Sequence, residues 1–479
     1  MDKEQAYSIA IAAVTALVQE RGPAVVFPFD QIWQYAPANQ SVPSRQRPAL
    51  ARRLQTAGYI VPTGGYTAAV TDSRAGSPTR AYRPGPTLVP APATPEPQGS
   101  GVAEGIVQSV AGALTNLVLA MDARGFIVIP EHLANFYLAL MSSPMVIMTG
   151  TSGTGKSWLP RVFAELTGSG FSRVPVKPQW DDNSDMFGYV PPLQSAQFVQ
   201  GEFTKAILAA NENTSVPHLV LLDEMNLAAV EHYFSDFLSV IETRRREGGL
   251  VVTDPLPLEL PPPPDVGPDP FAMLRALSLP AQVRVIGTAN MDETTRSFSS
   301  KVLDRAFSIE FGDVDLSAFP AMSPTDVNEA QFSILAQRLA DPMNPVRVTE
   351  AHAAHADLCE EVATYLESIR TILAPAGLSF AYRTRDAVCY YMANWEQDEL
   401  ESILPKSDAL DYCILQKVLP KIQGQGQLLS ETLATLTEWL QGQQVPGVEP
   451  GPGLQRCADK LSRMRARLEA DGTTTFWGA

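Results

Sequence analysis

The chain has 479 residues, of which 36 are basic and 52 are acidic, and its formal net charge is −16. This length predicts two to four domains, and the acidic balance excludes nonspecific nucleic-acid binding by most of the chain. The sequence opens without a basic and apolar leader, and its longest apolar stretch, Ile106 to Met121, is interrupted by polar residues, so we expect a cytoplasmic protein without membrane contact.

The first 85 residues have the opposite charge balance, with nine basic and five acidic side chains. Apolar spacing predicts three helices here, at about residues 4–20, 29–36 and 44–57. Short strands are expected on both sides of Gly64 and Gly65, and again at residues 79–82. The third helix carries Arg45, Arg47, Arg52 and Arg53. A basic helix followed by a β wing is typical of a small winged-helix-like domain that binds DNA. The alternative is a protein-binding domain with solvated arginines.

Residues 86–104 are rich in proline, alanine and glycine, a composition that favours an extended, semi-rigid tether. We therefore expect residues 1–85 to form a separate domain that moves relative to the rest. A second proline-rich stretch near residues 250–272 lies between two predicted core strands, which indicates a surface insertion. The remainder is expected to divide into an α/β domain at residues 105–315 and a helical domain at residues 316–479.

The most informative segment is a glycine-rich loop between a predicted strand at residues 145–148 and a predicted helix at residues 158–166. The loop consists of Gly150, Thr151, Ser152, Gly153, Thr154, Gly155, Lys156 and Ser157. Backbone N–H groups of such a loop turn inward around phosphate oxygens, and the helix N-terminus adds its positive dipole end. Lys156 is expected to reach the β- and γ-phosphates, and Ser157 to hold Mg²⁺. The order strand, loop, helix predicts a P-loop α/β fold with a parallel sheet.

An apolar run begins at His218 and is followed by two carboxylates, Asp223 and Glu224. Such a run is typical of a buried parallel strand, and ligands gather at the carboxyl ends of these strands. Asp223 is expected to bind Mg²⁺ through water. Glu224 is expected to orient and deprotonate the water that attacks the γ-phosphate.

Two further polar residues flank later strands. A predicted strand at residues 283–290 ends in Asn290, whose amide can hydrogen-bond both water and γ-phosphate. Arg305 stands just before another apolar strand, at residues 307–311. In ring-forming ATPases an arginine at this place points at the nucleotide of the neighbouring subunit, and such arginine fingers contribute about 10³–10⁵ in rate. A surface salt bridge between Arg305 and Asp304 is the alternative.

Together these motifs resemble the AAA+ superfamily and, more narrowly, its McrB-like branch of restriction NTPases. The narrower resemblance rests on five stretches: WDDNSDMFGY at 180–189, DEMNLAAVE at 223–231, GTANMDETT at 287–295, VLPKIQG at 418–424 and TFW at 475–477. It covers about residues 105–479 and leaves residues 1–85 outside. It implies that the helical domain is a lid over the nucleotide. It also places Arg383 in the nucleotide-contacting second-sensor region, although helix capping or a surface role fits Arg383 as well.

The resemblance implies a homo-oligomeric, hexameric ring with nucleotide between subunits, Mg²⁺ as cofactor and GTP or ATP as substrate. Such a ring acts on double-stranded DNA together with a McrC-like nuclease subunit, and no nuclease constellation stands out in this chain. Known members use GTP, but nothing here resembles the Asn-Lys-x-Asp guanine motif, so the choice of base stays open. Residues 1–85 do not resemble a modified-cytosine reader, so recognition of methylated DNA is not implied.

The sequence therefore predicts an NTP hydrolase that serves as the motor or regulatory subunit of a McrBC-like anti-phage restriction complex. Two other functions stay open. A MoxR-like ATPase chaperone would remodel protein partners and would be indifferent to DNA. A DNA-binding adaptor would use nucleotide only as an assembly switch. Glu224 and Arg305 argue against the adaptor, because a pure switch need not keep hydrolytic groups.

Overall fold

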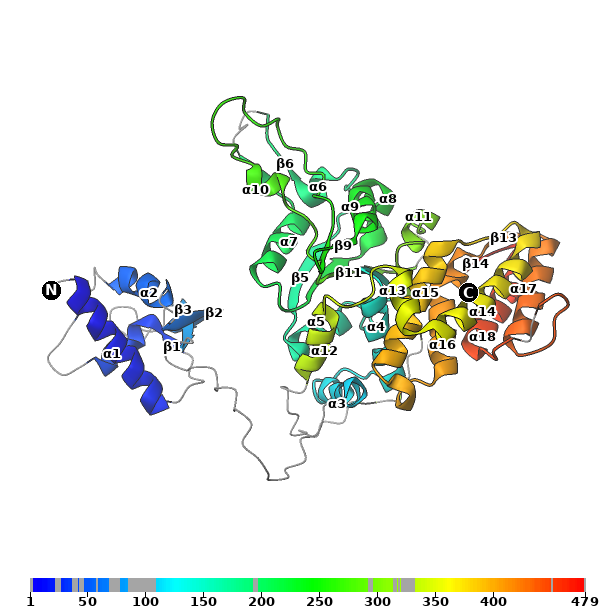
Figure 1. Cartoon of the computed structure of the whole chain (residues 1–479), viewed down its shortest axis with the longest axis horizontal. Helices are drawn as coiled ribbons and strands as arrows, with labels where there is room; N and C mark the ends of the chain where they lie inside the picture. The colour runs from blue at the N-terminus through cyan, green and yellow to red at the C-terminus, as the bar shows by residue number, and fades with distance from the viewer. Residues whose placement is uncertain are drawn as a thin grey trace, which may run out of the picture. The chain divides into compact units, whose positions relative to one another are not determined.

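The computed structural model describes residues 3–21, 27–36, 42, 47–56, 59–68, 78–84, 109–192, 197–291, 296–312, 317, 319, 332–448 and 451–477. The chain divides into two compact units, Met1–Gly105 and Ile106–Ala479, shown in Figure 1. The linker predicted at residues 86–104 lies outside the described residues. Among the described helices, none combines the length and the apolar character that a membrane span requires.

The N-terminal unit contains helices on a small antiparallel sheet with the strand order β1-β3-β2. Its elements are α1 (Lys3–Arg21), β1 (Phe27–Pro28), the 3₁₀ helix η1 (Phe29–Tyr35), α2 (Arg47–Thr56), β2 (Ile60–Ala68) and β3 (Pro78–Pro84). Apolar side chains from these elements form one core, in which Leu17, Ile32 and Leu54 are fully buried.

The predicted turn at Gly64 and Gly65 is wrong. Both glycines lie inside the single strand β2, which pairs with β3, and the register of that pairing shifts between Pro62 and Tyr66. A proline has no N–H for the ladder, and glycines tolerate the backbone of a bulge. The residues that suggested a turn therefore form an irregularity within one strand.

The larger unit is built on a five-stranded parallel sheet with the order β12-β4-β11-β8-β5. Its strands are β4 (Met145–Gly150), β5 (Gly170–Pro175), β8 (His218–Asp223), β11 (Val283–Ala289) and β12 (Phe307–Phe311). The strands predicted at residues 145–148, 218–223, 283–290 and 307–311 are confirmed within a residue or two at their ends. All residues of β8 and β11 are buried, as expected for central strands with both faces covered.

Alternation along each strand divides the core between the two faces of the sheet, because successive side chains of a strand point to opposite faces. Val146, Met148 and Leu221 pack into one core with α3, α4, α5 and the C-terminal helices. Met145, Ile147 and Val220 pack into a second core with α7, α8 and α9. The α-helices of this domain are α3 (Val110–Ala123), α4 (Pro130–Ser142), α5 (Trp158–Thr167), α6 (Ser184–Phe187), α7 (Glu202–Glu212), α8 (Val230–Tyr233), α9 (Ser235–Val240), α10 (Ala272–Arg275) and α11 (Ser300–Leu303). Its 3₁₀ helices are η3 (Met225–Leu227) and η4 (Ile241–Thr243).

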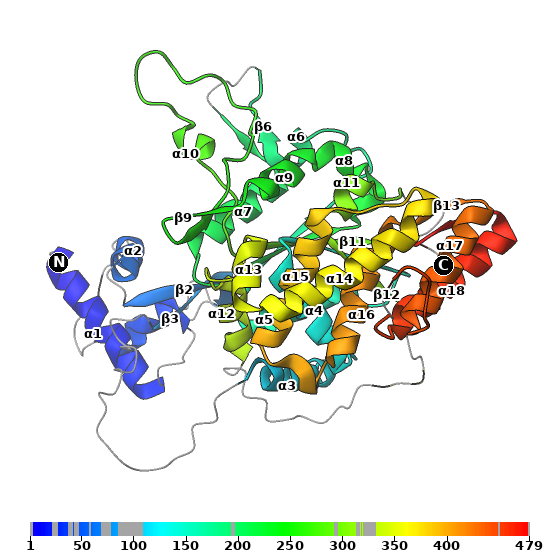
Figure 2. The ribbon, with the colours of Figure 1, turned by 45° about the vertical axis from the view of Figure 1, so that its right-hand side comes forward.

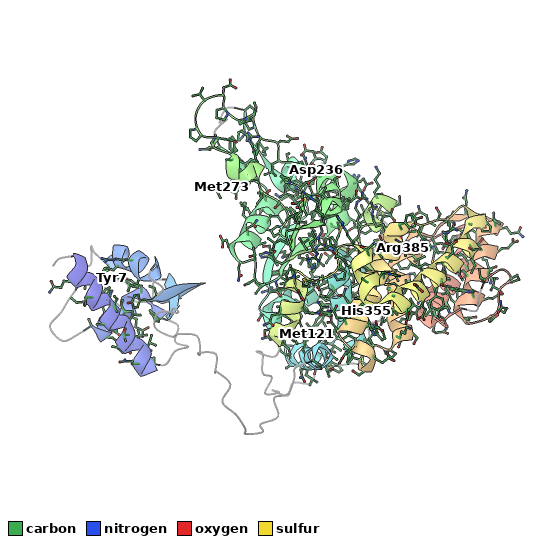
Figure 3. All side chains as sticks on the ribbon, viewed as in Figure 1. Tyr7, Met121, Asp236, Met273, His355 and Arg385 are labelled. Carbon is green, nitrogen blue, oxygen red and sulfur yellow. The ribbon has the colours of Figure 1, made fainter. Side chains whose placement is uncertain are left out.

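Two short hairpins and a proline-rich arm extend from this domain. The hairpins pair β6 (Gly188–Tyr189) with β7 (Val199–Gln200), and β9 (Arg245–Glu247) with β10 (Leu250–Val252). The arm follows β10, carries α10 and projects away from the C-terminal helices (Figures 1 and 2). Its base is anchored by buried Leu256 and Phe271, whereas Met273 on the arm is 87% exposed (Figure 3).

The C-terminal part of the unit is helical, as predicted. Its helices are α12 (Ser333–Ala340), α13 (Val348–Ala354), α14 (Ala356–Leu373), α15 (Tyr382–Gln397), α16 (Lys406–Lys417), α17 (Gln427–Leu440) and α18 (Gln455–Asp471), with the 3₁₀ helices η6 (Ala374–Ala376), η7 (Leu400–Ser402) and η8 (Leu419–Lys421). A small antiparallel pair joins β13 (Gln423–Gln425) to β14 (Thr473–Thr475). The parallel sheet and the C-terminal helices confirm the predicted P-loop-type α/β fold with a helical C-terminal region.

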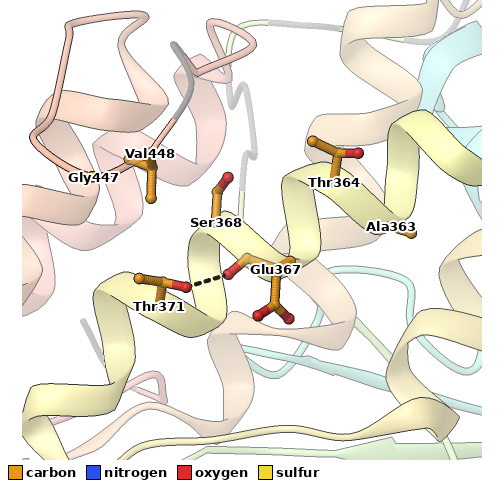
Figure 4. Close-up of a pocket in the computed structure, with 7 residues that line it drawn as sticks. All are labelled: Ala363, Thr364, Glu367, Ser368, Thr371, Gly447 and Val448. Atoms are coloured by element: carbon orange, nitrogen blue, oxygen red, sulfur yellow. Dashed lines mark hydrogen bonds between the residues drawn. The ribbon is translucent and has the colours of Figure 1, made fainter.

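A surface cavity of about 670 Å³ lies beside α14 and is lined by Thr364, Glu367 and Ser368 on that helix and by Val448 from the loop before α18 (Figure 4). None of the residues predicted to bind nucleotide lines it. The candidate site therefore has to be built from the loop and strand ends of the sheet.

Candidate functional site

The glycine-rich loop joins the carboxyl end of β4 to the first turn of α5, in the order that the motif requires. Its three glycines, Gly150, Gly153 and Gly155, all have positive φ angles, of 140°, 86° and 92°, a conformation that other residues rarely adopt. A Cβ atom on Gly155 would also lie 2.4 Å from the Phe126 ring. These positions therefore need glycine for backbone freedom and, at Gly155, for close packing.

Lys156 is folded back onto the loop in this structure. Its Nζ donates hydrogen bonds to the carbonyl oxygens of Gly150 (3.0 Å) and Thr151 (2.6 Å). Burial lowers the pKa of Lys156, and the nearby carboxylates of Asp223 and Glu224 partly oppose that shift. The ammonium group is thus held at the loop, next to the two acids that end β8.

Asp223 is the centre of a hydrogen-bond network. Its Oδ1 accepts hydrogen bonds from the hydroxyls of Ser157 (2.7 Å) and Thr288 (2.8 Å). Its Oδ2 accepts from Nε of Arg173 at 2.9 Å and also from the Nη2 group of that residue. Three neighbouring strands and the phosphate loop therefore converge on one carboxylate.

The charge state of Asp223 is set by opposing effects. Burial alone would raise its pKa, but the hydrogen bonds from Ser157, Arg173 and Thr288 and the charge of Arg173 outweigh burial, so the pKa of Asp223 is lowered. The carboxylate is therefore ionised at neutral pH. A carboxylate beside a hydroxyl is an oxygen donor set of the kind that Mg²⁺ prefers, so Ser157 and Asp223 fit the predicted metal.

Glu224 has an unusual backbone. Its φ of 55° lies in the left-handed region, which among the described non-glycine residues only Glu399 shares. Such a conformation costs on the order of 1–3 kcal/mol and is concentrated at functional sites. The backbone N–H of Glu224 donates to the Thr288 hydroxyl at 3.0 Å, and its side chain is exposed. The backbone turn thus directs the carboxylate away from the core.

Asn290 follows β11, the strand between β4 and β8 in the sheet, and so lies at the same edge as the phosphate loop and Glu224. Its carbonyl accepts a hydrogen bond of 2.9 Å from Nδ2 of Asn226. Asn226 is 1% exposed and also donates to the carbonyl of Arg296 at 3.4 Å. The buried Asn226, two residues after Glu224, is therefore hydrogen-bonded to Asn290 and to Arg296, which both lie between β11 and α11.

Arg305 and Arg383 lie together. Both guanidinium groups form ion pairs with Oε1 of Glu242, and the Arg383 contact is 2.5 Å long. Arg305 also donates to the carbonyls of Leu238 (3.0 Å) and Lys301 (2.6 Å). The alternative partner of Arg305, Asp304, is instead paired with Lys421 at 2.5 Å.

These two arginines lie at the sheet edge opposite the phosphate loop. The carbonyl of Arg305 accepts a 3.0 Å hydrogen bond from Ser143, which precedes the first residue of β4. The phosphate loop begins at Gly150, the last residue of the same strand. A strand of this length spans about 16–20 Å, which is longer than one side chain. Arg305 and the Arg383 side chain paired beside it therefore do not point at the phosphate loop of their own chain.

The arginines predicted to bind DNA are partly used within the N-terminal unit. The guanidinium of Arg47 lies 4.9 Å from the centroid of the Trp33 ring and donates to the carbonyl of Val42 (3.1 Å). The guanidinium of Arg53 lies 3.8 Å from the centroid of the Tyr7 ring. Arg45 and the side chain of Arg52 lie outside the described residues.

Trp180, in the segment after the phosphate loop, is buried and packs edge-on against Tyr233.

Sequence reasoning missed three residues of the site. Thr288 could have been found, since it is a polar side chain one position before the end of an apolar strand, and β11 and β8 run parallel with Gly287 beside Leu222. Arg173 lies in the edge strand β5, and Glu242 follows a short helix. Neither carries a local signal, because each becomes significant only through a partner more than 45 residues away in the chain.

Two stretches of the chain match known protein families. Residues 145–307 match the family described as "AAA domain (dynein-related subfamily)". Residues 341–474 match a domain of unknown function, DUF8727. No curated protein matches the sequence. Among solved structures, a "putative ATPase" from Cytophaga hutchinsonii ATCC 33406 is similar at 14% identity and a TM-score of 0.38, over 64% of this chain and 84% of that chain.

The AAA domain match covers β4, the phosphate loop, Asp223, Glu224 and Arg305. Residues 145–307 therefore resemble AAA domains, which bind a nucleoside triphosphate and usually Mg²⁺. AAA domains generally assemble into rings.

Proposed function

Starting from an AAA+ core at residues 145–307, we propose that this chain is a nucleoside triphosphatase whose active site is completed by a second copy of itself. Lys156 would bind the β- and γ-phosphates, and Ser157 and Asp223 would hold Mg²⁺, which supplies charge neutralisation of the phosphates. Glu224 would accept a proton from the attacking water, and Asn290 would orient that water.

The observation that carries the proposal is the network around Asp223. The hydroxyls of Ser157 and Thr288 hold one oxygen of the carboxylate, while the Thr288 oxygen also accepts from the backbone of Glu224. The group predicted to bind metal and the predicted base are thereby fixed to each other through a single threonine. Preorganised polar groups of this kind lower the reorganisation cost of catalysis.

The second copy is needed because Arg305 and Arg383 lie at the opposite sheet edge. Their common partner, Glu242, keeps two guanidinium groups at one place on the surface of the core. In a head-to-tail ring this place on one subunit would face the phosphate loop of the next. We therefore assign Arg383, together with Arg305, to the nucleotide of a neighbouring subunit.

The nucleotide base would lie on the apolar surface between α3 and α4. Phe126 packs against the phosphate loop at Gly155 and against Trp158, with ring centroids 5.3 Å apart. Ile127 and Ile129 flank it and are 46% and 45% exposed. An apolar surface accepts either purine, so GTP and ATP remain equal candidates.

For the biological role we propose a motor or regulatory subunit of a McrBC-like restriction complex, acting on double-stranded DNA with a McrC-like nuclease. This rests on the five sequence stretches named above. One observation favours a MoxR-like remodeller of proteins as the second candidate. Arg47 and Arg53 stack on aromatic rings of their own unit, which leaves less of the predicted DNA-binding charge free for phosphate contacts.

The shared active site can be tested by mixing two variants. The Arg305→Ala variant would lack the arginine that acts on the neighbouring subunit, but it would keep Glu224. The Glu224→Gln variant would lack the base, but it would keep Arg305. Each variant alone should lose hydrolysis of ATP and GTP. An equimolar mixture should recover about one quarter of wild-type turnover, because one interface in four combines both intact groups when subunits assemble at random. Absence of recovery, with both variants folded, would overturn the shared site.

The biological role needs a second measurement. Phosphate release is followed with ATP and with GTP, each with and without duplex DNA. Stimulation by DNA that disappears in Glu224→Gln would support the restriction motor. Hydrolysis indifferent to DNA would contradict that role and favour the remodeller.

A further inference from the structure

Two lysines of the helical region contact the segment that carries Arg305. Lys417 is the last residue of α16, and Lys421 is the last residue of η8. Lys421 belongs to the VLPKIQG stretch, to which the proposed function assigns no role. The contacts of both lysines are with the loop between α11 and β12, and with the start of α15.

Lys417 holds this loop by its carbonyl groups. The side chain is 2% exposed, and its Nζ donates to the carbonyl oxygens of Asp304 (2.8 Å), Ala306 (2.8 Å) and Leu303 (3.4 Å). The intervening carbonyl of Arg305 accepts from Ser143. A buried ammonium group is costly unless its donors are satisfied, and here all three donors are satisfied by one loop conformation. A different loop conformation would leave Lys417 buried without partners.

Lys421 links the two arginine-bearing segments to each other. Its Nζ forms an ion pair with Oδ1 of Asp304 (2.5 Å) and donates to the Thr384 hydroxyl (2.6 Å). Asp304 directly precedes Arg305, and Thr384 directly follows Arg383. One ammonium group therefore connects the side chain before the first arginine to the side chain after the second.

Within the part of the chain that the structure describes, the basic side chains of this cluster outnumber their acidic partners. The cluster contains four basic side chains, Arg305, Arg383, Lys417 and Lys421, and its ion pairs among the described residues are with two carboxylates, Glu242 and Asp304. Cations placed so closely repel one another, and the pKa of Lys417 is lowered by burial and by Lys421, Arg383 and Arg305. An arrangement of this kind is favoured by an added anion, such as the phosphates of a neighbour's nucleotide.

We propose that Lys417 and Lys421 are positioning residues that hold Arg305 and Arg383 in one fixed arrangement, so that the helical region controls the reach of both arginines toward the neighbouring subunit. The inference rests on the proposed function and adds its regulation. A shift of α16 and η8 against the sheet would move the Arg305 loop and the start of α15 together. The position of the helical region would thereby control the rate of hydrolysis in the neighbouring subunit and not in the subunit to which the helices belong.

The test compares Lys421→Met with Lys421→Arg and with the matched control Lys406→Met. Lys406 lies on the same helix as Lys417 and forms a half-exposed ion pair with Glu361 at 2.6 Å, so its loss should change little. Lys421→Met should lower kcat about 10²-fold, the effect of a catalytic group misplaced by about 1 Å. Lys421→Arg should recover part of that loss. The Kd for nucleotide should stay unchanged, because the phosphate loop lies at the other edge of the sheet.

Mixing separates positioning from a general folding defect. An equimolar mixture of the Lys421→Met and Glu224→Gln proteins should recover about one quarter of wild-type turnover, because one interface in four again combines both intact groups. If the mixture does not recover, while Arg305→Ala with Glu224→Gln does, the inference is wrong and the proposed function stands. If Arg305→Ala alone keeps wild-type turnover, the proposed function itself fails.

A second variant keeps the test decisive should Lys421→Met not fold. Asp304→Asn removes the same ion pair from the other side and leaves the lysine in place. It should show the same loss of kcat, the same unchanged nucleotide Kd and the same recovery with Glu224→Gln. Wild-type kcat in Asp304→Asn would overturn the inference.

Discussion

At the scale of single residues, the site depends on a few polar atoms with more than one partner. Thr288 shows this best, because its hydroxyl donates to Asp223 and accepts from the backbone of Glu224. A hydroxyl can do both at once, and no apolar residue of the same shape can replace it. The strand end is therefore as important for chemistry as the motif residues that it supports.

We predict that Thr288→Val lowers kcat about 10-fold with little change in KM. The valine would leave the Glu224 N–H without an acceptor, which costs about 1–3 kcal/mol, and it would remove one of the side chains that donate hydrogen bonds to Asp223. Thr288→Ser keeps the hydroxyl and serves as control. Steady-state phosphate release measures both, and wild-type kcat in Thr288→Val would show that the network has no catalytic part.

The lowered pKa of Asp223 predicts a pH dependence of stability. Because its folded-state pKa lies below the ordinary value of 3.8, ionised Asp223 stabilises the fold above that pH, and the contribution is lost as the pH falls through the folded-state pKa. The melting-temperature difference between wild type and Asp223→Asn should therefore be constant from about pH 5 to 8 and shrink below about pH 4. Asp265→Asn, on the exposed arm, serves as the control. A melting-temperature difference between wild type and Asp223→Asn that increased in acid would contradict the prediction.

At the scale of elements, buried cations join helices to the sheet. Arg284 at the start of β11 is 3% exposed. It donates to the carbonyls of Leu140 near the end of α4, Ala281 before β11 and Leu339 near the end of α12. The last carbonyls of a helix have no partner within the helix. One guanidinium therefore satisfies two helix ends and fixes both against a central strand.

We predict that Arg284→Met destabilises the chain by about 3 kcal/mol, since several buried carbonyls would lose their donors at once. Arg161, exposed on α5, offers the control Arg161→Met, which should stay within about 0.5 kcal/mol of wild type. Urea unfolding followed by circular dichroism measures both. Equal midpoints for the two variants would show that the helix ends are satisfied in some other way.

At the scale of the whole molecule, the chain divides into two units, Met1–Gly105 and Ile106–Ala479, and the proposed function would place recognition in the first and hydrolysis in the second. All residues of the proposed catalytic site lie in the second unit. We predict that a chain of residues 106–479 folds, keeps the basal turnover of the full chain within about twofold, and loses any stimulation by DNA or by a protein partner. Melting curves and phosphate release with and without the partner test this. Stimulation that survives the truncation would place recognition in the larger unit.

The sequence by itself determined the local chemistry of this protein. A strand, eight loop residues and a helix, followed by an apolar run ending in Asp223 and Glu224, are sufficient to predict a P-loop core, because phosphate binding needs these residues in direct succession. The same reasoning located four of the five strands of the parallel sheet and the helical C-terminal region, but it did not predict β5. It failed at Gly64 and Gly65, where strand pairing with β3 overrode a local turn signal.

Only the tertiary structure decided which distant residues meet. The register of β11 beside β8 brings Thr288 to Asp223, and the packing of α16 and η8 brings Lys417 and Lys421 to the Arg305 loop. The convergence of Arg305 and Arg383 on Glu242 joins residues up to 141 positions apart. Such contacts have no local signature, because they follow from how apolar faces pack across the whole unit and not from the residues beside them in the chain.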